Sequence, residues 1–343
     1  MNEHNRQHGF TTVEILVGVV IGLLVCLTAL STFTFMETQK RSTMGRNGAL
    51  SNGGLALFQI ENEAKHAGLG LMTTSAFVCS TANLGYKGTV LLNKSPLYPV
   101  LITDGGTGSD SIKFAYLNSL SGATTIKIAK DMDSASGTIY TNVDPNTSSG
   151  NLLLLRESGY PCTFRQVSSV AASGSGYAVT HTSGDYNVST SSFTQPITYV
   201  SGDYVAFTSG LTWVKYDVSN GTLRETDNIT GTTRTIADSV VGMKAYYGVS
   251  DASTSSAKSI SSWQSPSSFT VSDTNLLKVR AIRVGVALRS PERDNSCPGT
   301  SSTLTLWDSG PTIDISGVTD WKCYKFQTYS MIIPLFNVTS GIR

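Results

Sequence analysis

The hydrophobic pattern of the chain begins with a run of 21 residues without charge, from Ile15 to Phe35. At about 1.5 Å per residue, a helix of this length spans a hydrocarbon core of about 30 Å. The run is longer than the apolar core of an ordinary secretory signal, and no A-x-A cleavage site follows it. We therefore expect a membrane-spanning helix that stays in the mature protein.

The next stretch, METQKRSTMGRNGALSNGGLALFQIENEAKHAGLGLM, also has a helical period. Its apolar residues fall on one face of a helix, at Leu50, Leu57, Ile60, Ala64 and Ala67. Four glycines in it each cost up to about 1 kcal/mol relative to alanine: Gly45, Gly48, Gly53 and Gly54. We expect one helix from Phe10 to about His66, about 85 Å long, with a softened, interrupted middle.

After Gly70 the period changes to short β-type runs separated by Gly, Ser, Asn and Asp. The clearest runs are SIKFAYL, LTWVKYDV and KVRAIRVGVALRS, and the last run, 324–337, contains Pro334, which predicts a strand end or a sheet edge. Other strands are expected near 89–93, 124–129, 151–156, 161–170, 203–207 and 240–247. Residues 168–195 suggest a flexible excursion or a weak edge hairpin, and residues 250–275 suggest the same. The predicted class is α+β.

Composition and charge argue against a nucleic-acid partner. The formal net charge is +1 and only 14% of the residues are charged, so there is no basic footprint and no acidic tail. Ser, Thr and Gly are abundant while Lys and Glu are scarce, which favours an extracytoplasmic, β-rich protein.

Four of the five cysteines lie in polar surroundings, without a CxxC pair and without nearby histidines, at Cys79, Cys162, Cys297 and Cys323. This pattern favours two disulfides in an oxidising compartment over a zinc site. We favour Cys79–Cys162 and Cys297–Cys323, because each pair takes consecutive cysteines and closes a moderate loop. Sequence alone leaves the other pairings open, since four cysteines allow three connectivities. Cys26, in the apolar run, is expected to be a packed small hydrophobe.

The charges that flank the apolar run conflict with the cysteines over topology. Arg6 is the firm cation before the run, whereas Lys40, Arg41 and Arg46 follow it, which by itself would place the carboxy-terminal side in the cytoplasm. Large domains translocate largely regardless of flanking charge. We therefore give more weight to the predicted disulfides than to the flanking charges, and we expect the body of the protein outside the cytoplasm.

Glu14 lies at the mouth of the apolar run, where a lone carboxylate near the bilayer centre would cost about 2.5–3.5 kcal/mol. The sequence GFTTVE followed by this run resembles the class III signal of type IV pilins and pseudopilins. The resemblance implies that a prepilin peptidase cuts between Gly9 and Phe10 and that Phe10 becomes N-methylated. It also implies that Glu14 pairs with the methylated amino group of an adjacent subunit. The commonest family form has leucine where this chain has Thr12, which leaves the expected cleavage site unchanged.

Four stretches of the body resemble the PilW group of minor pilins. They are FQIENEAKHAGLGL at the end of the helix, CTFRQVSSV, GTLRETD with IADSVVGMKAYYGVS, and KVRAIRVGVALRSPE with YKFQTYSMIIPLFNV. The closing motif of that group usually has an arginine before the asparagine, where this chain has Phe336 before Asn337.

The resemblance implies a pilin-like fold, with a long amino-terminal helix packed on an antiparallel sheet. Residues 1–9 would be the leader, 10–35 the transmembrane helix, 36–70 the periplasmic half of that helix and 71–343 a β-rich domain. That domain could divide into two lobes near 195–202. The implied partners are other minor pilins, the major pilin, an inner-membrane assembly platform and the prepilin peptidase.

Three functions compete on these features. The first is a minor pilin in the inner membrane and then at the pilus tip, with a role in priming pilus assembly and in twitching motility. The second is a pseudopilin of type II secretion, similar to the large J component. The third, from a different class, is a membrane-anchored periplasmic binding module or enzyme.

Candidate chemistry is sparse. The histidines are His4, His8, His66 and His181, and no G-x-S-x-G elbow is present. GGTGSD (105–110) lacks the spacing of a phosphate-binding loop and is expected to be a turn between strands. DMDSASG (131–137) begins like a calcium loop, but it has no glycine at the sixth position and no distal glutamate. We predict no catalytic residue, no metal and no cofactor.

Overall fold

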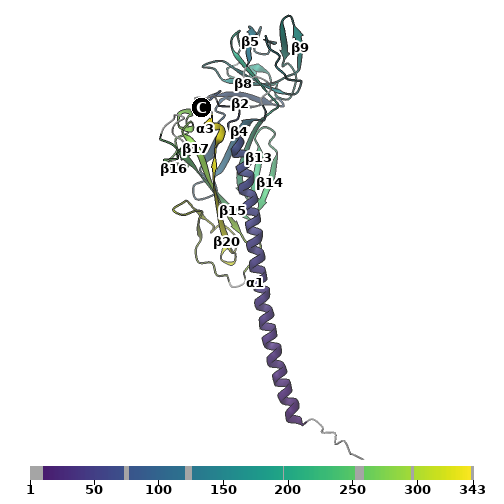
Figure 1. Cartoon of the computed structure of the whole chain (residues 1–343), viewed down its shortest axis with the longest axis vertical. Helices are drawn as coiled ribbons and strands as arrows, with labels where there is room; N and C mark the ends of the chain where they lie inside the picture. Colours follow the sequence, from purple (N-terminus) through teal and green to yellow (C-terminus); the bar gives the residue numbers. More distant parts are fainter. Residues whose placement is uncertain are drawn as a thin grey trace, which may run out of the picture.

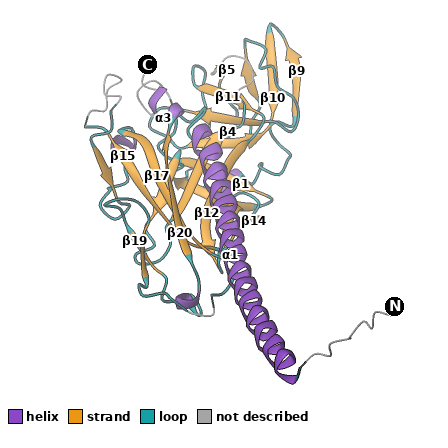
Figure 2. Ribbon diagram, turned by 60° about the horizontal axis from the view of Figure 1, so that its bottom comes forward, coloured by secondary structure: helices purple, strands orange, loops and turns teal. Residues whose placement is uncertain are grey.

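The computed structural model describes residues 11–72, 77–119, 126–195, 197–251, 259–294 and 297–340. One long helix, α1 (Thr12–His66), extends from a β-rich body as a stalk (Figure 1). Its first half stands clear of the body, and its second half lies along the sheets (Figure 2). The α+β class with a long amino-terminal helix is therefore confirmed.

The helix is continuous over its 55 residues, so the interruption predicted from the glycines is wrong. An added Cβ at Gly53 would lie 2.6 Å from a ring carbon of Tyr329, whereas one at Gly48 or Gly54 would meet nothing within 4 Å. Gly53 therefore lets the helix approach the sheet closely. Packing of the helix on the sheet outweighs the glycine penalty of up to about 1 kcal/mol per residue.

Two sheets form the part of the body beside α1. One has five strands in the order β14-β13-β12-β4-β3, and the other has four in the order β16-β15-β17-β20. The strands of the first are β3 (Val100–Thr103), β4 (Ser111–Leu117), β12 (Leu211–Ser219), β13 (Thr222–Asp227) and β14 (Thr233–Asp238). Those of the second are β15 (Val240–Val249), β16 (Ser262–Gln264), β17 (Val279–Arg289) and β20 (Phe326–Pro334).

The second half of α1 forms one core with these two sheets. Leu57, Ile60 and Ala64, at helical spacing, pack in the same cluster as Phe114 of β4 and Val284 of β17. The apolar face predicted at 57–67 is therefore the buried face of the helix. At about 25 cal/mol per Å² of buried apolar surface, this contact is the main attraction between helix and sheet.

A third sheet lies at the end of the molecule farthest from the amino-terminal end of α1 (Figure 1). We call it the distal sheet; its nine strands have the order β2-β1-β8-β7-β11-β5-β6-β10-β9, all antiparallel except the parallel pair β1–β8. Its strands are β1 (Ala82–Tyr86), β2 (Thr89–Ser95), β5 (Ile126–Lys130), β6 (Ile139–Thr141), β7 (Leu152–Arg156), β8 (Cys162–Gln166), β9 (Ser169–Ser173), β10 (Gly176–Thr180) and β11 (Tyr204–Thr208).

Most of the distal sheet is inserted between two neighbouring strands of the five-stranded sheet. β4 and β12 pair antiparallel, with Leu117 opposite Leu211, and the chain between them carries β5 to β11. Residues 195–202 lie between β10 and β11, and both strands belong to the distal sheet. Its own core includes Ile128, Leu153 and Phe207.

The remaining elements are short. They are the 3-10 turns Thr190–Ser192 and Trp321–Cys323, α2 (Asp273–Leu276), α3 (Phe336–Ser340) and the strand pair β18 (Thr303–Thr305) and β19 (Thr312–Asp314). The run predicted as strand over 324–337 ends at Pro334, on the edge strand of its sheet, as that proline indicates. Beyond it α3 turns back, and Asn337 donates hydrogen bonds to the carbonyls of Lys65 and His66 at the end of α1.

Two disulfides are present. One joins Cys79 to Cys162, across 83 residues, and the other joins Cys297 to Cys323, across 26. The first ties the segment after α1 to β8 of the distal sheet, and loop-closure entropy gives each a stabilising effect of about 3–5 kcal/mol. Cys26 is exposed on the free half of α1, so its predicted packing is not present within the chain.

Candidate assembly site on the amino-terminal helix

The predicted processing site, Gly9 and Phe10, lies outside the described residues. The description begins one residue later, at Thr11, which is the amino-terminal cap of α1. Glu14 belongs to the first turn of the helix and is exposed.

Thr11 and Glu14 form a capping box. The backbone N–H and the hydroxyl of Thr11 donate to Oε2 of Glu14 at 2.9 and 3.0 Å, and the N–H of Glu14 donates to Oγ1 of Thr11 at 3.3 Å. A carboxylate in the first turn also suits the positive end of the helix dipole. Glu14 thus has a local structural role within its own chain, in addition to any role toward a neighbour.

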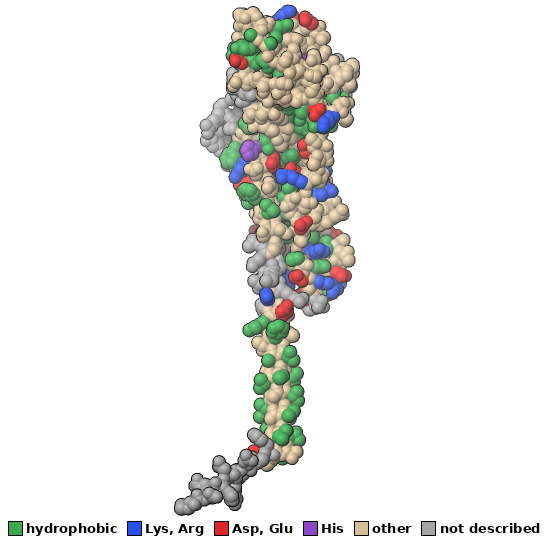
Figure 3. Space-filling model, turned by 90° about the vertical axis from the view of Figure 1, so that its right-hand side faces the viewer, with side chains coloured by type: hydrophobic (Ala, Val, Ile, Leu, Met, Phe, Trp, Pro, Cys, Tyr) green, Lys and Arg blue, Asp and Glu red, His purple; other side chains and the backbone are tan. Residues whose placement is uncertain are grey.

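One segment of the described chain, Thr12–Glu37, is long and apolar enough to cross a membrane. Its most apolar window of 18 residues has a mean hydropathy of 2.7, and in the isolated chain none of that window is buried. Apolar side chains cover the stalk on the face seen in Figure 3, and the charged side chains gather on the body. An exposed apolar helix of this length is compatible with a single membrane span.

The exposed apolar surface of α1 continues past Glu37. Leu55 and Phe58 are exposed at 45% and 61%, one turn apart, on the side of the helix that faces away from the core residues Leu57 and Ile60. Two large apolar side chains spaced three residues apart form a stripe that another helix can pack against.

The end of α1 is fixed to the five-stranded sheet by polar contacts. The hydroxyl of Tyr116 on β4 donates to Oε2 of Glu63 at 2.9 Å. Burial raises the pKa of the Glu63 carboxyl, and burial together with the Glu63 charge raises the pKa of Tyr116 to about 12. His66, one turn on, contacts the Tyr116 ring with 5.5 Å between ring centroids.

A second cluster of polar side chains lies in the same five-stranded sheet. Tyr216 donates a short hydrogen bond to Glu225, and Arg234 binds the same carboxylate through two nitrogens at 2.8 and 2.9 Å. Burial and the Glu225 hydrogen bond raise the pKa of Tyr216. These contacts join β12, β13 and β14, so their role is structural.

The GGTGSD turn binds a lysine of its own chain. It links β3 to β4, and Oδ1 of Asp110 accepts from Nζ of Lys244 on β15 at 2.8 Å and from the N–H of Gly105 at 3.0 Å. Lys244 also donates to the carbonyl of Gly106 at 2.6 Å. The expected turn is therefore present. The Gly106 carbonyl and the Asp110 carboxylate of the turn both accept hydrogen bonds from the buried ammonium group of Lys244.

The distal sheet contains a buried cation beside a histidine. Nε of Arg165 donates to Nδ1 of His181 at 3.3 Å, and another guanidinium nitrogen donates to the carbonyl of Val188 at 2.6 Å. Burial, with the Arg165 charge as a second cause, lowers the pKa of His181 to about 4. A neutral imidazole held in this way serves packing.

No group of three or more His, Cys, Asp or Glu side chains suited to a metal ion occurs among the described residues. Within DMDSASG, Oδ1 of Asp131 accepts the N–H of Ser201 at 2.8 Å, and Met132 is buried. Asp131 therefore forms a hydrogen bond with the loop that precedes β11.

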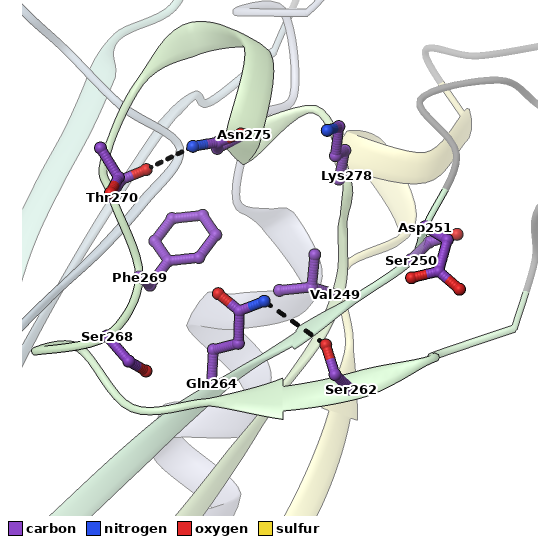
Figure 4. A pocket seen from close by; sticks show the side chains of 10 residues that line it. All are labelled: Val249, Ser250, Asp251, Ser262, Gln264, Ser268, Phe269, Thr270, Asn275 and Lys278. Carbon is purple, nitrogen blue, oxygen red and sulfur yellow. Dashed lines mark hydrogen bonds between the residues drawn. The ribbon is translucent and has the colours of Figure 1, made fainter.

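A hollow of about 310 Å³ lies where β15, β16 and α2 meet (Figure 4). Two of the polar side chains that line it form hydrogen bonds with other residues of the same wall. Asn275 donates to the carbonyl of Thr270 at 2.9 Å, and Gln264 donates to the hydroxyl of Ser262 at 3.4 Å. Phe269 stacks on Tyr247 at 4.2 Å between centroids. Two charged side chains, Asp251 and Lys278, also line it.

Sequence reasoning missed two of these features. The capping box is visible as Thr11-x-x-Glu14 before an apolar run, a signature that could have been read directly. The Asp110–Lys244 pair joins residues 134 apart and has no local signal.

One comparison with known proteins agrees with the resemblance drawn from the sequence. Residues 186–337 match the family model described as "Type IV Pilus-assembly protein W". Comparison with curated proteins gave no match, and comparison with solved structures gave none either. The matched stretch runs from before β11 to the start of α3 and is separate from the GFTTVE signal. Over residues 186–337, the chain is therefore similar to the PilW family of type IV pilus-assembly proteins.

Proposed function

We propose that this protein is a minor pilin that primes type IV pilus assembly and then lies at the pilus tip. The observation that carries the proposal is the combination of a PilW-type body over residues 186–337 with an exposed apolar helix over Thr12–Glu37. The family match and the apolar helix lie in different parts of the chain, and both support a protein of the type IV pilus assembly.

Before assembly, the apolar segment would anchor the protein in the inner membrane with its body in the periplasm. Two disulfides in the body fit an oxidising compartment. A prepilin peptidase would cut between Gly9 and Phe10 and leave Phe10 as an N-methylated terminus. Residues 10–35 would then be the transmembrane helix, and residues 36–70 would carry the body at 71–343.

In the filament, Glu14 would face the amino-terminal ammonium of an adjacent pilin. Glu14 is exposed on the first turn, and its carboxylate is already oriented by Thr11. A carboxylate among apolar helices is stable only when a cation compensates it, so such a pair would fix the axial register of the subunits. Leu55 and Phe58 would extend the contact to a neighbouring helix outside the membrane.

The distal sheet supports a place at the tip. It adds a second layer of structure beyond the sheets that hold α1, at the end opposite to the membrane helix (Figure 1). A subunit stacked above would have to accommodate this extra lobe. A tip position removes that requirement, and the other minor pilins and the major pilin would follow below.

A pseudopilin of type II secretion is the alternative, since its helix would serve the same purpose. The match to a pilus-assembly family favours the pilus. Deletion should abolish twitching and leave type II secretion intact; a secretion defect with normal pili would refute the proposal.

Mass spectrometry of the protein from piliated cells tests the processing step. The mature chain should begin with N-methyl-Phe10. An intact Met1 terminus in cells that make pili would rule out a pilin and would leave a membrane-anchored periplasmic protein as the alternative.

A further inference from the structure

We infer that the edge strand β9 of the distal sheet is a self-pairing site, at which a second copy of this chain adds its own β9 in antiparallel register. The observations are an open strand edge, the absence of protecting charges and a sequence that complements itself. The inference concerns the distal sheet and is independent of the amino-terminal helix.

β9 (Ser169–Ser173) is the last strand of the distal sheet, and among the described strands its one neighbour is β10. The two form a hairpin with Ser173 opposite Gly176 and Ser169 opposite Thr180. The residues that flank a two-residue loop form a hydrogen-bonded pair, and bonded positions alternate along the strand. The N–H and C=O groups of Val170 and Ala172 therefore point away from β10, and Figure 2 shows β9 at the outer margin of the sheet.

The other long edges in the described part of the chain are covered or blocked. At β14, Asn52 of α1 donates to the carbonyl of Asp238. At β3, the N–H of Ile102 donates to the hydroxyl of Tyr247 at 2.6 Å. The β20 edge lies beside α1 and ends in Pro334, and β2 carries the exposed Lys94.

Among the described residues, none of these protections is present at β9. Between Arg165 and Asp185 the chain contains no Asp, Glu, Lys or Arg, and no proline. Except for Val170, which is half-buried, the side chains of β9 are exposed and small. Proteins that keep strand edges unpaired use charge, proline or a cover for that purpose. An open, uncharged edge is suited to the addition of another strand.

The sequence Ser-Val-Ala-Ala-Ser fits a second copy of itself. With a two-fold axis at Ala171, Ser169 lies opposite Ser173, and Val170 lies opposite Ala172 of the second copy. Val170 and Ala172 then form the hydrogen-bonded pairs through their outward groups. Ala171 faces its own counterpart at a non-bonded position, where Cα atoms are about 4.5 Å apart. No like charges and no bulky side chains oppose each other in this register.

The register predicts a specific cross-link. In full-length protein with Cys26→Ala, in detergent, Ala171→Cys should give a disulfide-linked dimer under mild oxidation, because about 4.5 Å lies within the disulfide range. Ser175→Cys, at the exposed hairpin turn outside the paired strand, is the control. Cross-linking of Ala171→Cys that is no faster than that of Ser175→Cys would overturn the inference.

A charge swap at the same position separates strand pairing from association of the membrane helices. Ala171→Lys alone and Ala171→Glu alone should each self-associate more weakly than the wild type, by up to about fivefold, since like charges directly opposite destabilise a strand pair. A mixture of differently tagged Ala171→Lys and Ala171→Glu chains should restore a mixed dimer. An Ala171→Lys chain that dimerises like the wild type would refute the site. A wild-type chain that stays monomeric, yet gains amide protection at β9 when another pilus protein is added, would assign the edge to that protein and also overturn the inference.

Discussion

The carboxylate of Glu14 accepts hydrogen bonds from the backbone N–H and from the hydroxyl of Thr11, at 2.9 and 3.0 Å. This relationship gives Glu14 two separable properties: an acceptor that caps its own helix, and a negative charge available to a neighbouring subunit. Substitutions at the two residues can remove one property and leave the other.

Glu14→Gln should retain the capping acceptor and lose the charge, since glutamine also serves at the third position of a capping box. If Glu14 pairs with a neighbour's ammonium, this variant should be membrane-inserted and folded but absent from purified pili. The measurement is immunoblotting of sheared pilus and membrane fractions.

Thr11→Ala is the matched control. It removes the cap, with an expected loss of about 0.5–2 kcal/mol of helix stability, and keeps the charge. We expect it to enter pili. Entry of Glu14→Gln together with exclusion of Thr11→Ala would mean that capping alone explains Glu14.

Gly53 and Gly54 should respond oppositely to alanine. At Gly53 a new Cβ would lie 2.6 Å from Tyr329, so Gly53→Ala should destabilise the body, by about 1–3 kcal/mol for an overpacked contact. At Gly54 a Cβ meets nothing within 4 Å, so Gly54→Ala should stabilise the helix by up to about 1 kcal/mol. Urea denaturation in detergent measures both, and equal effects would contradict close packing at Gly53.

Asp110→Asn should destabilise the protein strongly. Lys244 and Asp110 have side chains that are 6% and 1% exposed, and loss of the Asp110 charge leaves the buried ammonium with only the more distant and more exposed Asp104. Breaking a buried pair in this way costs about 3–5 kcal/mol. Asp104→Asn is the control, because Asp104 is 36% exposed and lies 3.6 Å from the same ammonium; it should cost at most about 1 kcal/mol. The comparison is made by thermal denaturation, and similar losses for both variants would show that burial does not determine the effect.

The distal sheet should lose stability as the pH falls from about 6.5 to about 4. Burial lowers the pKa of His181 to about 4, so in this range the unfolded chain binds a proton that the folded chain does not. Full stability is present above the unfolded pKa, near 6.5, and is lost as the pH falls toward the folded value. At about 1.4 kcal/mol per pH unit, the loss approaches roughly 3 kcal/mol.

His181→Gln should remove this part of the pH dependence, and His66→Gln, at an exposed position, should leave it unchanged. Hydrogen exchange of the distal strands at pH 7 and pH 4 measures the difference between variant and wild type. The same pH dependence in His181→Gln as in the wild type would exclude His181 as its source.

Local patterns in the sequence determined the elements that depend on periodicity. The uncharged run from Ile15 predicted the free half of α1, and alternation predicted β4, β12 and β17 close to their observed bounds. Consecutive cysteines were the favoured disulfide partners, and both of those disulfides are present. The helix and strands were predictable because the period of an element is set by residues close together in the chain. The disulfides were predictable because each joins cysteines that are consecutive in the sequence.

Tertiary structure decided the rest, because the partners lie far apart in the chain. The helix stays continuous at Gly53 since Tyr329, far along the sequence, fills the space beside it. The pairing of β4 with β12 makes the distal sheet an insertion, which no local pattern indicates. Lys244 and Asp110 each resemble ordinary surface residues in the sequence, and only the packing of β15 against the β3–β4 turn buries them together. Burial is a property of the assembled sheets, so the energies that depend on it follow from the fold and not from the pattern.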